Sequence, residues 1–142
     1  MRVKSHRRES RRGAALVEAA IILPVFTLLV FGLIEASRLA MVSTILTEAS
    51  REGCRLAVID GYTNSDVTDR VNEILTQAGI STSDVTTTQT PSDCTTVQST
   101  DNPNTVSVNL SVPYNKVSWL GTPFLFQTAT VTASATMSSE RP

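Results

Sequence analysis

An unbroken apolar run dominates the first third of the chain. From Ala14 to Ile34 there are 21 residues, and Glu18 is the sole charged residue among them. Pro24 and Thr27 are the other interruptions. As a helix, this run is roughly 31 Å long, which matches the hydrocarbon thickness of a bilayer. The pattern therefore predicts a transmembrane helix.

Beyond this run the pattern becomes amphipathic. Helical spacing of apolar positions predicts that the helix continues to about Ile59 and ends at Asp60-Gly61. The apolar stripe consists of Leu39, Val42, Ile45, Leu46, Ala49, Gly53 and Leu56. The residues expected off this stripe are Arg38, Glu48, Arg51, Glu52 and Arg55. One helix of about 45 residues is the simplest interpretation.

The second half of the chain predicts a short helix and then strands. A helix is expected from Asp66 to Ala78, with Asn64 and Ser65 as capping residues and Gly79 after its end. Residues 81–105 are rich in Ser and Thr and predict a loop, with one short strand around 84–89. Strict alternation predicts two strands, from 106 to 112 and from 129 to 137.

These elements together predict an α+β fold. It comprises a long N-terminal helix, a second short helix and a small antiparallel sheet of two to three strands, with the helices packed on the sheet. At 142 residues, the chain allows one small domain besides the apolar helix. The expected organisation is a basic leader at 1–13, a transmembrane helix at 14–34 and an exported α+β domain at 35–142.

Charge is distributed unevenly, and this predicts the topology. Six of the twelve Lys and Arg residues precede Gly13, whereas the rest of the chain carries twelve acidic residues. A basic head before an apolar span is the positive-inside pattern, so the leader should stay in the cytoplasm and the acidic part should cross. This explains the basic residues better than nucleic-acid binding does. A cleaved secretory signal is disfavoured because its apolar stretch is shorter and ends in a small-x-small site.

The carboxylate of Glu18 lies where a membrane helix least tolerates charge. Such a residue costs about 2.5 to 3.5 kcal/mol on insertion scales, so it needs a partner. The alternative is a protonated or snorkelling side chain near the interface.

Three blocks of the sequence resemble the TadE-like family of the tight-adherence (Flp-type) pilus system. They are Gly13-Ala14-Ala15-Leu16-Val17-Glu18 with its continuation to Pro24, Gly32-Leu33-Ile34-Glu35-Ala36-Ser37-Arg38, and Ala49-Ser50-Arg51-Glu52-Gly53-Cys54-Arg55. The resemblance is dense over 13–59 and looser afterwards. Ala19 and Cys54 depart from the family pattern, which has an aromatic residue and an alanine there.

The resemblance implies a minor pseudopilin. A prepilin peptidase would cut after Gly13 on the cytoplasmic side and leave Ala14 as the new amino terminus. The freed amine of a neighbouring subunit would pair with Glu18 in assembly. Pro24 would bend the helix and, secondarily, take part in helix packing. Implied partners are the peptidase, other pilin or pseudopilin subunits, the inner-membrane assembly platform and membrane lipid, with the chain held by a single pass in the inner membrane.

Two cysteines, Cys54 and Cys94, both lie beyond the span on the oxidising side. A disulfide would close a loop of 40 residues and contribute about 4 kcal/mol in the chain-entropy model. The alternative is two buried thiols. We favour the disulfide because so small a domain has little core.

The residues disfavour an enzyme. The single histidine, His6, lies in the leader, and two cysteines alone do not make a zinc site. No phosphate-binding loop or metalloprotease motif occurs, so no cofactor, metal or nucleic acid is expected. The alternative function is a permanently anchored extracytoplasmic binding or adhesion module, with the Ser/Thr loop or the region of Trp119 contacting a ligand.

Overall fold

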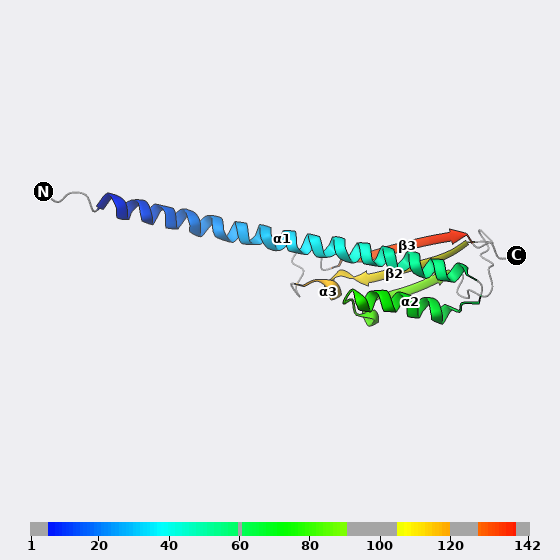
Figure 1. Cartoon of the computed structure of the whole chain (residues 1–142). Helices are drawn as coiled ribbons and strands as arrows, with labels where there is room; N and C mark the ends of the chain where they lie inside the picture. Colours follow the sequence, from blue (N-terminus) through cyan, green and yellow to red (C-terminus); the bar gives the residue numbers. More distant parts are fainter. Residues whose placement is uncertain (1–5, 60, 91–104, 120–127, 139–142) are drawn as a thin grey trace. The chain divides into compact units, whose positions relative to one another are not determined.

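A computed structural model describes residues 6–59, 61–90, 105–119 and 128–138 of the chain. The chain forms two compact units, Met1–Ser37 and Arg38–Pro142, and the second is termed the head. The elements follow the order α1, α2, a 3-10 turn at Thr82–Asp84, β1, β2, the short helix α3 at Tyr114–Val117, and β3 (Figure 1).

Helix α1 runs from His6 to Val58 and has 53 residues. Its end lies one residue before the predicted one. It begins eight residues earlier than predicted because the helix includes part of the basic leader, whose Arg and Glu residues favour helical backbone. Pro24 lies inside the helix without ending it.

Helix α2, Asn64–Gln77, begins at a capping residue that differs from the predicted ones. The N-cap is Thr63, not Asn64 or Ser65. The Thr63 hydroxyl accepts from the backbone N–H of Asp66, and the Asp66 carboxylate accepts from Thr63 N at 2.7 Å. Hydrogen bonds from the side chain and backbone of Thr63 lower the pKa of Asp66. Gly79 follows the helix at φ +69°, a conformation that suits glycine.

Three antiparallel strands form one sheet in the order β1, β2, β3. They are β1 Thr86–Thr90, β2 Thr105–Pro113 and β3 Thr130–Ser138. Each predicted strand lies within two residues of an observed one. In the register, Leu110 of β2 stands between Thr87 of β1 and Ala133 of β3. The α+β prediction is therefore confirmed.

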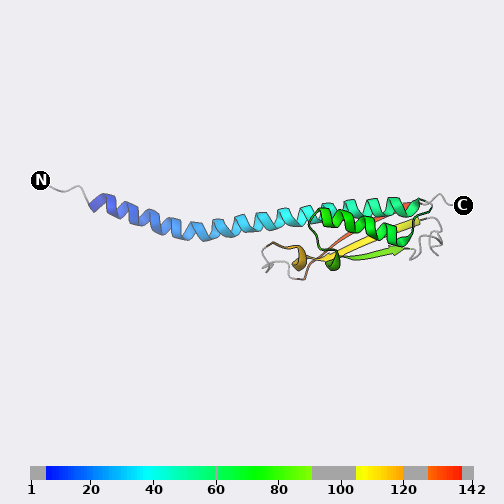
Figure 2. The same ribbon diagram turned by 60° about the horizontal axis from the view of Figure 1, so that its bottom comes forward.

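The core of the head lies between one sheet face and the two helices (Figures 1 and 2). The predicted apolar stripe of α1 lies in this layer, and three of its residues, Val42, Leu46 and Ala49, are fully buried. Helix α2 contributes Val67, Val71 and Leu75, and β2 contributes Val106, Val108, Leu110 and Val112. The opposite sheet face carries Ser, Thr and Asn. Alternation along the strands thus separates an apolar face from a hydroxyl-rich one.

One residue expected off the stripe is buried. Arg38 is only 7% exposed. Its Nε donates to the carbonyl of Val117 at 3.1 Å, and the guanidinium carbon lies 5.0 Å from the centroid of the Trp119 ring. Its position off the apolar stripe did not predict this burial, because the segment that covers Arg38 lies about 80 residues away in the sequence.

At Gly53, α1 packs closely against α2 and β2. A Cβ placed on it would lie 2.8 Å from Cγ2 of Val71, 3.5 Å from Val67 and 3.6 Å from Val108. By contrast, a Cβ on Gly32 would meet nothing within 4 Å. Of the two glycines, Gly53 is therefore the one whose missing side chain the packing requires.

Candidate functional site

The predicted processing and assembly residues all lie on the apolar part of α1. The twelve large apolar side chains between Leu16 and Ile34 that are exposed range from 39% to 72% exposed. Within the described residues, α1 is the one helix long and apolar enough to cross a membrane, and its most apolar stretch has no buried residue. Such a helix needs lipid or other helices around it.

Glu18 is exposed on this surface. The described residues offer it neither an ion pair nor a hydrogen bond. The other polar side chain of the run, Thr27, is satisfied within the helix, because its hydroxyl donates to the carbonyl of Leu23 at 2.8 Å. Among the described side chains of the span, Glu18 is thus the polar group whose hydrogen-bonding capacity no other described residue meets.

The Gly13–Ala14 peptide bond lies in continuous helix, and the space around Gly13 is open. Ala14 and Glu18 are four residues apart, which places both on one side of the helix, about one turn from each other. Pro24 removes the N–H that would bond to the carbonyl of Ala20. The helix places Gly13, Ala14 and Glu18 in one short segment, while Pro24 lies further along.

Cys54 lies apart from these residues, in the core of the head. It is fully buried, and its Sγ lies 3.1 Å from the carbonyl oxygen of Val106 and 3.6 Å from that of Ala135. Cys94 lies outside the described residues, so the disulfide stays a prediction.

We expect the bond to protect both thiols even in an unfolded chain. Alkylation in denaturant should add no label without reductant and two labels after reduction, measured by intact mass. Denaturant is essential because burial alone would shield Cys54 in the folded head. Two labels on the unreduced, denatured chain would refute the disulfide.

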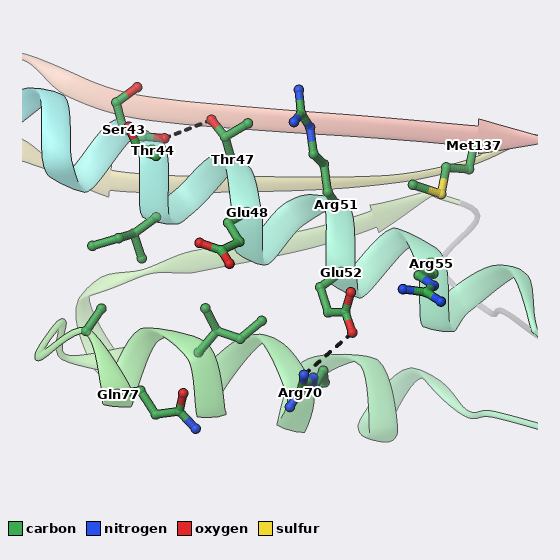
Figure 3. A pocket seen from close by; sticks show the side chains of 13 residues that line it. Ser43, Thr44, Thr47, Glu48, Arg51, Glu52, Arg55, Arg70, Gln77 and Met137 are labelled. Carbon is green, nitrogen blue, oxygen red and sulfur yellow. Dashed lines mark hydrogen bonds and ion pairs between the residues drawn. The ribbon is translucent and has the colours of Figure 1, made fainter.

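A groove lined by both charged and apolar side chains lies between α1 and α2 of the head, with a volume of about 930 Å³ (Figure 3). Arg70 of α2 crosses it to Glu52 of α1 at 3.5 Å and also pairs with Glu73 at 2.7 Å. These carboxylates, Glu73 foremost, raise the pKa of Arg70. The sequence alone placed Glu52 off the apolar stripe and gave no sign of this contact. The partners are 18 residues apart in different helices, and no local pattern links them.

The groove offers little for catalysis. Among its lining residues are three arginines, Arg51, Arg55 and Arg70, two glutamates, and no histidine or cysteine. Across the described part of the chain, no three His, Cys, Asp or Glu side chains gather in a way that would hold a metal ion. The charged groups that do meet are exposed ion pairs, which typically contribute at most about 1 kcal/mol to stability.

These observations define a class of protein with an α+β head and a long helix whose first part is apolar and exposed. Comparison with known families adds a similarity that covers most of that helix. Residues 13–55 match the family model described as TadE-like protein. The resemblance inferred from the sequence is confirmed over this segment, which includes both Gly13 and Glu18. No curated protein and no solved structure gives a significant match.

The match over residues 13–55 points to a component associated with the Tad pilus system. The TadE-like family has structural and assembly roles in that system. Together with the apolar helix it also supports membrane anchoring. The matched segment ends at Arg55 and covers α1 up to its last turn.

Proposed function

We propose that this chain is a minor pseudopilin-like subunit of a Tad pilus assembly system. In this proposal a prepilin peptidase cuts after Gly13, and the mature chain assembles through its N-terminal helix with other pilin or pseudopilin subunits and the inner-membrane platform. The basic leader faces the cytoplasm and the acidic head is exported, as the charge distribution favours.

The isolated carboxylate of Glu18 carries the proposal. An ionised carboxylate costs about 2.5 to 3.5 kcal/mol at the centre of a membrane helix and less toward its ends, and this chain's described residues offer Glu18 no partner. Cleavage after Gly13 would create a new positive charge, the α-amine of Ala14, at nearly the same depth. The amine of one subunit and the carboxylate of the next would neutralise each other in lipid. That pairing would also fix the axial offset between neighbouring helices.

Glycine suits position 13 because a protease must unwind the helix around the bond that it cuts. A glycine inside a helix is less favourable than alanine by about 1 kcal/mol, which lowers the cost of local unwinding. The Cβ-free backbone also lets a catalytic group approach closely.

Cleavage is tested by replacing Gly13 with leucine in cells that express the peptidase. We expect the wild-type chain recovered from membranes to begin at Ala14 and the Gly13→Leu chain to begin at Met1, as read by intact mass and terminal sequencing. Gly32→Leu in the same helix is the matched control, and it should be cut normally. A wild-type chain that keeps Met1 would contradict the proposal and would fit the anchored binding module instead.

A further inference from the structure

Trp119 is the most exposed large hydrophobic side chain among the described residues of the head. It is 68% exposed, compared with 47% for Met41 and 45% for Ile59. A tryptophan combines a large apolar ring with a polar N–H, so its exposure to water is costly and it commonly marks a place where apolar and aqueous phases meet. It is also the single tryptophan of the chain.

The ring is held by the structure around it. Trp119 follows α3, Tyr114–Val117, whose two ends are buried. The N–H of Tyr114 donates to the carbonyl of Ala129 at 2.8 Å, which ties α3 to the start of β3. On the other side, Arg38 bonds to Val117 and lies against the Trp119 ring. The exposed ring therefore has a defined position beside Arg38.

Arg38 lies close to the end of the apolar run. It follows Ile34 by four residues of continuous helix, a rise of about 6 Å. The headgroup layer on each side of a bilayer is about 5 to 8 Å thick. If Ile34 ends the hydrocarbon-spanning part of α1, Arg38 and the ring beside it lie at headgroup level. Tryptophan is enriched at this depth in membrane proteins.

We propose that Trp119 docks into the lipid headgroup layer beside the point where α1 leaves the membrane. The partner is the lipid surface itself. Through Arg38 and α3 this contact would hold the exported head at the bilayer surface. The inference rests on the membrane-spanning role of α1 and is independent of cleavage and of Glu18.

The single tryptophan makes a direct test possible. The full chain is reconstituted in phosphatidylcholine vesicles at low protein density, and its fluorescence is measured with aqueous iodide and with lipids brominated at shallow or deep acyl positions. We expect blue-shifted emission, loss of iodide quenching, and stronger quenching by shallow than by deep bromines.

The matched control moves the tryptophan to the far end of the sheet. In the double variant Trp119→Phe, Thr136→Trp, the new ring lies on the exposed hydroxyl-rich face, where Thr136 pairs with Ser107 of β2. The emission of this tryptophan should keep the wavelength of a water-exposed ring, and iodide should quench it. Equal iodide quenching of wild type and control would overturn the proposal. A second result would also overturn it: Trp119 is protected from iodide but not quenched by bromine, and this protection is lost when the protein is diluted in lipid. The partner would then be a second copy of the chain. Neither result would affect the terminal residue at Ala14, which tests the proposed function separately.

Discussion

Replacing Glu18 with glutamine is expected to remove the chain from pilus subcomplexes while leaving its insertion and cleavage intact. Glutamine keeps the shape of the side chain and lacks its charge. An unpaired glutamine therefore has a lower free-energy cost in lipid than an unpaired glutamate. The partner amine then has no counter-charge. If pairing recovers the insertion cost of about 2.5 to 3.5 kcal/mol, its loss weakens association by about a hundredfold.

The measurement is co-purification of other pilus subunits with the tagged chain from membranes. Thr27→Val is the matched control, because it changes the other polar side chain of the run and removes only an internal bond to Leu23. It should co-purify normally. Full co-purification by the Glu18→Gln variant would show that assembly does not use this carboxylate.

Replacing Gly53 with alanine is expected to destabilise the head by about 1 to 3 kcal/mol. Alanine in a helix normally stabilises it by about 1 kcal/mol relative to glycine, so even the sign of the effect is informative. The added methyl would lie 2.8 Å from Val71, and a valine cannot easily turn away because its χ1 is restricted. A head of this size has only a few kcal/mol of stability to lose.

The change is measured by denaturant unfolding of the full chain in detergent, followed by Trp119 fluorescence. Gly32→Ala is the control and should leave unfolding of the head unchanged, since a Cβ at that position would have nothing within 4 Å. Adding Val71→Ala to Gly53→Ala should relieve the clash. The double variant should therefore lose less unfolding free energy than the sum of the losses of the two single variants. A Gly53→Ala chain as stable as wild type would contradict the close approach.

Local periodicity made most of the fold predictable. The alternation of Val106, Val108 and Leu110 with polar residues predicts a half-buried strand, and these three side chains are buried in the sheet. The stripe of α1 was equally clear, since helical spacing is a property of neighbouring residues. The register between strands and the placement of β1 beside β2 depend on contacts between distant segments, so they required the structure.

The errors have identifiable causes. Thr63, Asn64 and Ser65 are all good capping residues, and the choice depends on which one has extended backbone. A signal was present: Asp66 stands three residues after Thr63, as a capping box requires. Arg38 gave no such signal, because its burial depends on Val117 and Trp119, far along the chain.

In the candidate site, too, local features could be predicted from the sequence and contacts between distant segments could not. Gly13 and Glu18 could be singled out from the sequence because they belong to a short motif next to an apolar run. The family match covers both positions, and their roles stay predictions. The groove between α1 and α2 was missed because it forms only when Arg70 of one helix meets Glu52 of the other.

Zero-length cross-linking tests the central claim most directly. A lipid-soluble carbodiimide joins a carboxyl to an amine in contact with it, with loss of water, and mass spectrometry of the membrane-assembled complex identifies the joined peptides. The account predicts an amide between Glu18 and the N-terminal amine of a separate subunit, seen as two linked peptides. Absence of such a link, or a link only within one peptide between Glu18 and its own Ala14, would contradict it.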